Sequence, residues 1–561
     1  MPTTLARLIS VAKGELPADL LLTNAEVINV FTAEIEPGNV AICGDRIAGV
    51  GDYHQAKQVL DLRGKYIAPG LINGHIHPES SMLDIGQYAR AVVPHGTTAL
   101  VTDLHEIANV CGLEGIRYVL NHARRLPFDL FLMAPSCVPA TQLETSGASL
   151  DPGDIRQVLR WKGCIGLGEV MNFPGVLAGD DSVLSKINLA TGKIVDGHAP
   201  GVAGKDLNAY IAAGILSDHE SVSIEEAREK LRQGMFIMIR EGSSEKNLDA
   251  LLPLVTEKTY KRCMFVVDDR SCVDLLRDGD IDAVVRKAIR QGLDPVRAIQ
   301  LATINPAERF RLGRLGAVAP GYMADLIVLG DLSRLQIDMV FYRGQMVATE
   351  GKPLFPSYQP TSKGLTNTVN IKPFNIGVLR LSASGETEPV IEIVPGQIIT
   401  RKRREKIKAT HGVIMPDTER DILKLVVVER HKATGNMGIG LVTGFGLKGG
   451  ALVSSIAHDS HNIIAVGTND EDIFTAIREI ERLQGGLVAA AQGEVLASLA
   501  LPIAGLLSEE PLEVVVSKFE KLEQIATELG TALSSPFATL SFLALPVIPE
   551  IRLTDLGLVE V

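Results

Sequence analysis

Short apolar segments and helix-patterned segments alternate through residues 70–313, and this alternation constrains the fold more than any other feature of the chain. The apolar runs number eight, and most end in a polar or ionisable residue. They are Gly70–His77, Ala99–His105, Leu130–Cys137, Cys164–Glu169, Lys193–His198, Ile215–His219, Phe236–Glu241 and Met264–Asp269. Eight alternations of strand and helix are typical of an α/β protein with a (β/α)8 TIM barrel, whose active site lies at the carboxyl ends of the strands. The polar residues are at those ends, so their placement and the fold prediction support each other.

The segments on either side of the barrel predict further domains, because 561 residues are too many for one compact core. Strand patterns precede residue 70 and return after the barrel, which predicts a composite β-sandwich built from residues 1–69 and 314–360. Its expected strands are Leu20–Val30, Val40–Gly51, Val59–Tyr66, Ala324–Leu329 and Met339–Ala348. The barrel is expected over residues 70–313. An additional C-terminal α+β domain is expected over residues 361–561, with strands such as Leu423–Glu429 and Ile463–Gly467 and helices at Asp470–Gln484 and Pro511–Glu528.

Charge and composition exclude several classes of protein. The net charge of −12 argues against a protein that binds nucleic acid or an anionic membrane surface. The longest apolar stretch near the C-terminus, Val495–Leu507, is short and contains Pro502, so we expect no membrane span. The N-terminus lacks the pattern of a signal peptide, and the six cysteines form no Cys-x-x-Cys pair. We expect a cytoplasmic protein with reduced thiols that acts on a small molecule, and a homo-oligomer such as a dimer or tetramer.

The strand ends carry a set of residues that can bind metal. His75 and His77 are two positions apart, so in a strand their imidazoles share one face and can hold one ion. The full set of expected metal ligands is His75, His77, Glu169, His198, His219 and Asp268. These are enough for two divalent ions that share a bridging carboxylate, for which Glu169 is our candidate. A dinuclear centre lowers the pKa of a bridging water and so provides hydroxide near neutral pH.

Further polar residues at the same strand ends are candidates for catalysis or substrate binding. Asp268 is placed to ligate metal and to accept the proton of the attacking water, although Asp269 could exchange roles with it. The other catalytic candidates are Glu79, His219 and Glu220. The candidates for orienting ligands or contacting substrate are Asp103, His105, Glu106, Arg240, Glu241 and Asp269. Salt bridging within the barrel is the alternative interpretation for these groups. Nitrogen and oxygen ligands without thiolate suit manganese, iron or zinc.

Longer motifs around these residues carry a resemblance to a known family. The run Gly70-Leu-Ile-Asn-Gly-His-Ile-His77 resembles the first-strand motif of the amidohydrolase superfamily. Within that superfamily the chain resembles the adenine deaminases of bacteria and archaea. The motifs that carry this resemblance are Pro94–Thr98, His105–Asn109, Gly168–Gly175, Asp196–Gly201 and Ser217–Glu220 in the barrel, and Glu429–Gly435, Ala457–Asn462 and Ser541–Pro549 after it.

The resemblance implies an activity and a cofactor. It implies hydrolysis of adenine to hypoxanthine and ammonia, a reaction of purine salvage, in which a metal-activated hydroxide attacks C6. It implies Mn2+ or Fe2+, two ions per subunit, with Zn2+ also possible. Many members of the superfamily bridge the metals with a modified lysine on the fourth strand. Glu169 occupies that place here, so no carbamate is expected.

Two features leave alternatives open. Asp280 stands where the family pattern has a histidine, and it either alters substrate contact or caps a helix, of which we favour the cap. His458, Asp459 and His461 could form a further metal site or close over the barrel mouth, but hydrogen bonding within a turn is favoured. The competing functions are hydrolysis of another cyclic amidine or amide, and a catalytically silent metal-binding homologue.

Overall fold

The computed structural model describes residues 4–358, 364–395 and 397–561, so the predicted domain boundary between residues 360 and 361 lies outside the described residues. All eight strands predicted between residues 70 and 313 are present, although most are shorter than their apolar runs. They are β6 (Leu71–Asn73), β7 (Thr97–Thr102), β8 (Asp129–Ala134), β9 (Cys164–Val170), β10 (Ile194–Gly197), β11 (Ser217–Asp218), β12 (Phe236–Arg240) and β13 (Cys263–Val266).

These eight strands are hydrogen-bonded as two parallel sheets. Strands β6 to β10 form a sheet of five in chain order, and β11 to β13 form a sheet of three. A parallel bridge between Ile76 and Asp268 joins the first strand to the eighth, with the Asp268 amide donating to the His75 carbonyl at 3.0 Å. Strands β10 and β11 are linked through a side chain, because the Ala199 amide donates to Asp218 Oδ1 at 3.0 Å. This part of the chain therefore has mixed α/β content with its strand ends tied together at the predicted site.

The inner faces of the strands make one apolar core. Ala99 and Val101 on β7, and Met264 and Val266 on β13, are buried in the same cluster, whereas Leu100 between them belongs to the layer outside the strands. This two-residue period is expected for strands with both faces covered. The covering helices are α2 (Ile85–Val92), α3 (His105–Ala123), α4 (Pro152–Val158), α5 (Phe173–Ala178), α6 (Asp181–Leu189), α7 (Gly204–Ala212), α8 (Ile224–Arg232), α9 (Leu248–Leu251), α10 (Cys272–Arg277), α11 (Ile281–Arg290), α12 (Pro295–Leu301) and α13 (Ile304–Arg309).

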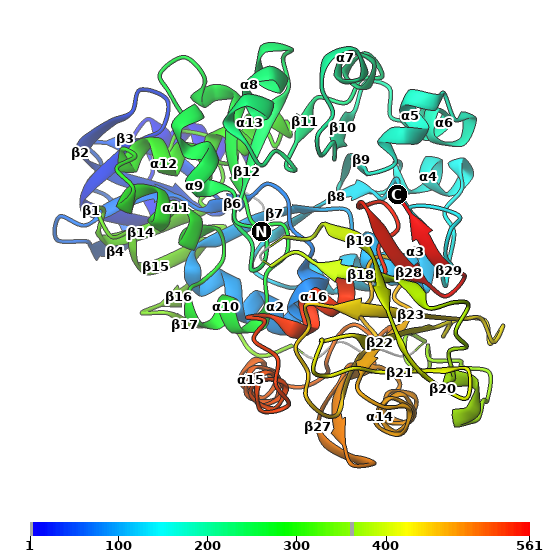
Figure 1. Cartoon of the computed structure of the whole chain (residues 1–561). Helices are drawn as coiled ribbons and strands as arrows, with labels where there is room; N and C mark the ends of the chain where they lie inside the picture. Colours follow the sequence, from blue (N-terminus) through cyan, green and yellow to red (C-terminus); the bar gives the residue numbers. More distant parts are fainter. Residues whose placement is uncertain (1–3, 359–363, 396) are drawn as a thin grey trace.

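The two flanks of the predicted barrel meet in a single nine-stranded sheet, as Figure 1 shows for the blue and green strands at one side of the molecule. The join is the antiparallel pairing of β5 with β14, in which Ile67 lies opposite Val328. The strands are β1 (Ala18–Asn29), β2 (Glu34–Cys43), β3 (Arg46–Gly51), β4 (Ala56–Asp61), β5 (Tyr66–Pro69), β14 (Leu326–Asp331), β15 (Gln336–Tyr342), β16 (Gln345–Thr349) and β17 (Lys352–Pro353). The participation of both flanks is as expected, and the two-layer sandwich itself stays a prediction.

Four details of this region differ from the sequence-based expectation. Val59–Tyr66 is not one strand, since β4 ends at Asp61 and β5 begins at Tyr66. Met339–Ala348 is a hairpin of β15 and β16, in which Tyr342 lies opposite Gln345. Val40–Gly51 is not one strand but a hairpin, because Gly44 adopts a left-handed φ of +61° between β2 and β3. A short helix, α1 (Leu5–Ala12), was not predicted. Thr4 caps this helix by accepting a hydrogen bond from the Arg7 amide, and Val11 is the residue of the helix that is buried.

The C-terminal region has a sheet of eight strands in the order β19-β18-β23-β22-β25-β24-β26-β27. These strands are β18 (Thr387–Ile393), β19 (Thr400–Lys406), β22 (Leu423–Val428), β23 (Met437–Thr443), β24 (Ala451–Ser454), β25 (Ile463–Gly467), β26 (Gly486–Ala491) and β27 (Glu494–Ala500). Two hairpins, β20 (Lys408–Thr410) with β21 (Val413–Met415) and β28 (Ile551–Thr554) with β29 (Gly557–Glu560), complete the strands. The helices are α14 (Asp470–Leu483), α15 (Leu512–Glu528) and α16 (Pro536–Phe542).

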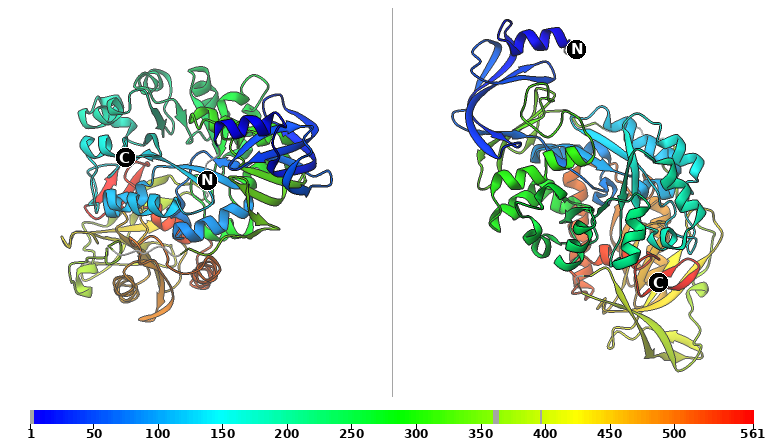
Figure 2. Two further views of the ribbon diagram at one scale, coloured as in Figure 1. Left: turned by 180° about the vertical axis from the view of Figure 1, so that it is seen from behind. Right: turned by 90° about the horizontal axis from the view of Figure 1, so that it is seen from above.

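This C-terminal region packs against the barrel. The Ser508 amide donates to the Met82 carbonyl at 2.8 Å, and the Leu512 amide donates to Gln87 Oε1 at 3.3 Å. Seen from above in Figure 2, the N-terminal strands lie at one end of the molecule and the yellow strands of the C-terminal region at the other. Among the described residues, no helix combines the length and the apolar character needed to cross a membrane.

Candidate metal centre

The two histidines of the first strand lie against the carboxylate that follows the eighth strand. The Nε2 atoms of His75 and His77 are each 3.2 Å from Asp268 Oδ1, and His77 Nε2 is 3.3 Å from Glu169 Oε1. The backbone fixes this arrangement, because the His77 amide donates to the Asp268 carbonyl at 2.9 Å. Three residues from opposite ends of the barrel sequence therefore present their ligand atoms to one point.

The other oxygen of Glu169 faces a second pair of histidines. His198 Nδ1 is 2.9 Å from Glu169 Oε2, and His219 Nε2 is 3.2 Å from the same oxygen. Glu169 is the sixth residue of β9, and its side chain is 4% exposed. One carboxylate thus has each of its oxygens directed at a different histidine pair, which is the geometry that a carboxylate bridging two ions needs.

The residues present fit divalent metal ions. Ligand atoms of His75, His77 and Asp268 lie within 4.8 Å of one another, as do those of His75, Glu169 and His219. His75 Nε2 is buried and has no hydrogen-bond partner among the described residues. Burial alone would raise the pKa of Glu169, but hydrogen bonds from His198, His219 and His77 hold it well below its usual value. A buried, ionised carboxylate among imidazoles is a donor set for a cation, and it contains no thiolate.

A buried lysine organises the loops that carry His198 and His219. Lys230 on α8 is fully buried, and its ammonium donates to the Ala199 carbonyl at 2.7 Å and to Asp218 Oδ2 at 2.9 Å. Asp218 in turn accepts from the Ala199 amide. The residues that follow the fifth and sixth strands are therefore tied to each other through one charge pair.

Some of the residues that were predicted to orient ligands or to contact substrate lie within the cluster. Asp103 Oδ1 is 3.0 Å from His105 Nδ1 and 3.5 Å from His77 Nδ1, and His105 Nδ1 is 3.6 Å from Glu169 Oε1. His105 was predicted only to orient ligands or to contact substrate, but its ring lies directly beside the candidate ligands. In the sequence, a histidine at the start of a helix after a predicted strand does not by itself indicate a position so close to metal ligands.

Arg240 is the cation at the edge of the cluster. Its guanidinium donates to Asp268 Oδ2 at 2.8 Å and to both oxygens of Glu220, one of them at 3.0 Å. Glu220 Oε1 is also 3.6 Å from His198 Nδ1 and 3.4 Å from His219 Nε2. Burial opposes ionisation of Glu220, but Arg240 and the two histidines hold its pKa far below the usual range.

Three predicted residues stand apart from the ligand atoms. Glu241 pairs with Lys287 at 2.6 Å and accepts from the Leu248 amide, so the structure does not bring it into the cluster. Asp269 accepts from the Ser80 hydroxyl, whereas Asp268 faces the histidines. Glu79 accepts from the Ile107 amide at 3.3 Å, and burial raises its pKa to about 7.

The C-terminal region closes one side of the site. The pocket that contains His77, Glu169 and Asp268 is also lined by residues that were not predicted as site residues. They are Met171 and Glu245 from residues 70–313, and Ile398, Phe542, Leu545 and Ile548 from the C-terminal region. Apolar residues of this kind are indistinguishable from core residues in a sequence. Beside this pocket lies a cavity of about 660 Å³, lined in part by His198, Glu220 and Arg240. Its size is in the range of small-molecule sites.

Comparison with known proteins assigns the family. Residues 66–347 match the amidohydrolase family, and residues 397–561 match the adenine deaminase C-terminal domain. A protein of Dehalococcoides mccartyi named adenine deaminase is 63% identical over all 561 residues, covering 98% of that protein. Adenine deaminase 2 of Carboxydothermus hydrogenoformans is 49% identical over 555 residues, covering 99% of this chain and 97% of that protein. The chain belongs to the adenine deaminase family.

Solved structures of other amidohydrolases are more distant from this member of the adenine deaminase family. A beta-aspartyl dipeptidase of Fervidobacterium islandicum is 17% identical with a TM-score of 0.47, and covers 61% of this chain and 99% of its own. An adenosine deaminase of Xanthomonas campestris with bound zinc is 14% identical with the same TM-score, and covers 61% of this chain and 95% of its own.

Asp280 does not cap a helix with its side chain as we predicted. It occupies the position before α11, but its side chain makes no capping hydrogen bond. Instead its two oxygens accept from Asn73 Nδ2 at 3.0 Å and from the Thr97 hydroxyl at 2.7 Å. The buried donors at the ends of β6 and β7 take the carboxylate away from the helix. Asp280 therefore supports the strand that carries His75.

The histidines of the Ala457–Asn462 motif also differ from the favoured interpretation. They do not bond only within their own turn, because His458 Nδ1 is 2.8 Å from Glu106 Oε1 of the barrel and His461 Nε2 contacts Glu106 Oε2. Glu106 is the second residue of α3 and had been expected only to orient ligands or to contact substrate. The motif thus contacts the barrel beside the metal centre.

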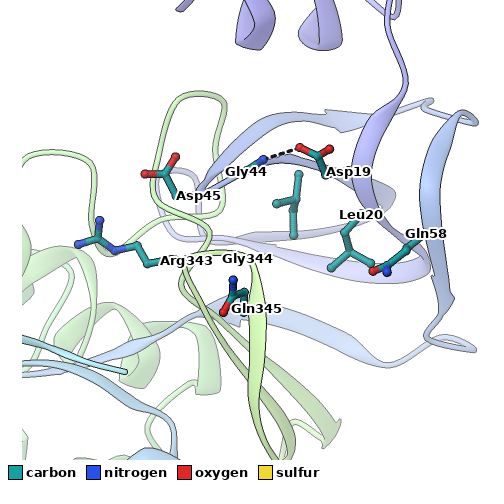
Figure 3. A pocket seen from close by; sticks show the side chains of 9 residues that line it. Asp19, Leu20, Gly44, Asp45, Gln58, Arg343, Gly344 and Gln345 are labelled. Carbon is teal, nitrogen blue, oxygen red and sulfur yellow. Dashed lines mark hydrogen bonds between the residues drawn. The ribbon is translucent and has the colours of Figure 1, made fainter. Parts of the chain in front are cut away.

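A separate hollow lies in the composite sheet. Figure 3 shows its lining, in which Asp19 accepts from the Gly44 amide at 2.8 Å and Arg343 approaches from the other flank of the chain. It shares no lining residue with the metal centre. We assign it no part in the chemistry of the site.

Proposed function

We propose that the chain hydrolyses adenine to hypoxanthine and ammonia at a dinuclear metal centre. The observation that supports the proposal most strongly is the placement of the Glu169 carboxylate, whose two oxygens face two separate histidine pairs. The full-length similarity to proteins named adenine deaminase supports the substrate. The cavity of about 660 Å³ beside the cluster supports a substrate of small-molecule size.

The proposed ligands divide into two groups. His75, His77 and Asp268 would hold one ion, His198 and His219 the other, and Glu169 would be shared. Divalent ions bound there would lower the pKa of a coordinated water and supply a nucleophile at neutral pH. The donor set accommodates Mn2+, Fe2+ or Zn2+, and two ions per subunit is our proposal.

The chain's own side chains would position and move protons. Asp268 lies between the two histidines and Arg240, so it is our candidate to accept the proton of the attacking water. Arg240 would hold Glu220 ionised next to His219, and Glu220 is the candidate to bind the amidine edge of the ring. The apolar side chains of Phe542 and Ile548 would limit access of bulk water to the ring.

The domain organisation of this enzyme is part of the proposal. We propose that the two parallel sheets work as one (β/α)8 barrel over residues 70–313. Residues 1–69 with 314–360 would form the sandwich, and residues 361–561 the additional domain. A cytoplasmic location, a role in purine salvage and assembly into a dimer or tetramer stay predictions from the sequence.

The test is ammonia release from adenine by protein expressed with manganese and protected from iron oxidation. We expect turnover by the wild type and its loss in Glu169→Gln, which is isosteric but offers only one ligand oxygen. Glu241→Gln is a matched control, since Glu241 bonds to Lys287 outside the cluster. Absence of turnover in fully metallated wild type, with turnover of another cyclic amidine, would replace adenine as the substrate.

A further inference from the structure

A third group of metal-binding side chains lies where the C-terminal region meets the barrel. Glu106 from α3 and the loop residues His458 and His461 present ligand atoms that all lie within 4.8 Å of one another. The three side chains are nine-tenths or more buried, with exposed fractions of 4% for Glu106, 10% for His458 and 1% for His461. None of them belongs to the set proposed above for the two ions.

The contacts within this group are those of atoms that converge on a point. His461 Nε2 lies against Glu106 Oε2, yet neither atom has a partner of acceptable hydrogen-bond geometry among the described residues. His458 Nδ1 is 2.8 Å from the other oxygen of the same carboxylate. Ligand atoms around an ion at about 2.1 Å are roughly 3.0–3.4 Å apart, so small side-chain movements would complete the site.

The surroundings hold both rings in place. The ring of His458 stacks on Phe542, with centroids 4.6 Å apart and planes 16° apart. Arg430, which is fully buried, donates to the backbone carbonyl of His461 and fixes that end of the loop. The rings are therefore pre-oriented toward Glu106, as the ligands of a metal must be.

The local charge also favours a cation. Asp459 lies between the two histidines in sequence, and its Oδ1 atom is 3.9 Å from His458 Nδ1. Its Oδ2 atom is buried without a hydrogen-bond partner among the described residues, so a further oxygen is at hand. Two carboxylates and two imidazoles in a buried site are a donor set for a divalent ion.

We propose that Glu106, His458 and His461 bind a third divalent cation, which links the C-terminal region to the barrel. The ligand set of two imidazoles and a carboxylate suits a transition-metal ion of the Mn2+, Fe2+ or Zn2+ type. The ion would fasten the loop that carries Asp459 over the pocket of the main centre. The site uses none of the six ligands proposed for the main centre, but Glu106 and His458 line the same pocket as those ligands.

The test is anomalous diffraction from crystals of the full chain grown with excess Mn2+, with metal content measured on the same preparation. We expect a peak between Glu106 and the two histidines, separate from the density at Glu169. His461→Asn should remove only that peak and lower the metal content by about one ion per chain. His431→Asn is the matched control, because His431 is half-buried on a neighbouring segment and bonds to the Ser460 carbonyl instead.

Each outcome decides the matter. A map with peaks around Glu169 and none beside Glu106 would show that Glu106 and the histidines form an ion pair only, and the third site would be rejected. A peak beside Glu106 with none around Glu169 would support the third site and reject the proposed dinuclear centre. The wild-type map gives this answer even where a variant fails to fold.

Discussion

Replacement of Lys230 by methionine tests how the loops after the fifth and sixth strands are held. Lys230 Nζ donates to the Ala199 carbonyl, Asp218 Oδ2, the Ser221 hydroxyl and Glu226 Oε1, at distances from 2.7 to 3.2 Å. Burial would lower the pKa of Lys230, but Asp218 and Glu226 raise it above its ordinary value, so the ammonium is charged. Methionine fills similar space but leaves the carboxylate of Asp218 buried without its cation.

The expected cost follows from that uncompensated charge. Removing one partner of a buried ion pair destabilises by about 3–5 kcal/mol. At about 2–4 °C per kcal/mol for a domain of this size, the barrel transition in calorimetry should fall by roughly 6–20 °C. Occupancy of the ion that we propose for His198 and His219 should fall as well, because Ala199 and Asp218 are their neighbours in the chain.

A double variant separates the charge effect from lost packing. Lys230→Met combined with Asp218→Asn removes the buried charge and keeps an oxygen for the Ala199 amide. It should recover at least half of the lost transition temperature. The reasoning is refuted if Lys230→Met lowers the transition by less than about 2 °C, or if the double variant is less stable than the single one.

Three other predictions concern different parts of the molecule. Asp280→Ala should weaken metal binding about 10–100-fold, because it removes the acceptor for Asn73 and Thr97. Asp280→Asn keeps an acceptor for Asn73 and should lose little affinity. Metal titration with a competing chelator measures both variants, and equal losses would contradict the prediction. Burial raises the pKa of Asp325 to about 7 from an unfolded value near 4, so its contribution to stability is full below pH ~4 and is lost as the pH rises through 7. Asp325→Asn should therefore raise stability at pH 8 by up to about 4 kcal/mol and leave it unchanged near pH 4, with exposed Asp52→Asn as the control, and denaturation at the two pH values decides. Removal of metal by a chelator should lower the transition temperature of the wild type, and added Mn2+ should restore it. For a metal supplied at 1,000 times its dissociation constant the loss corresponds to about 4 kcal/mol of unfolding free energy. An unchanged transition temperature would count against the metal centre.

The strands and the main cluster were predictable because their signals are local. An apolar run with a two-residue period that ends in a polar group indicates both a strand and the position of a candidate ligand, as Cys164–Glu169 does for β9. The hairpin at Gly44 could also have been found, since a glycine inside the run Val40–Gly51 is a common turn signal.

The remaining features depend on contacts between distant segments. Nothing near Asp280 in the sequence shows that Asn73 and Thr97 will supply donors to it, so the position before a helix suggested a cap. Glu106 and His458 are likewise far apart in the chain, and their meeting depends on how the C-terminal region docks. Phe542 and Ile548 line the pocket but have the composition of core residues, which hides their role.

The pairing of β5 with β14 has a consequence for synthesis on the ribosome. Strand β5 emerges before the barrel sequence and its partner emerges after it, so the sheet cannot be completed until the whole barrel has been translated. During that interval one edge of β5 exposes hydrogen-bonding groups to other nascent chains. Strands β1 to β5 pair with one another and can do so before the barrel sequence is made, so what waits for translation is the pairing that closes the free edge of β5.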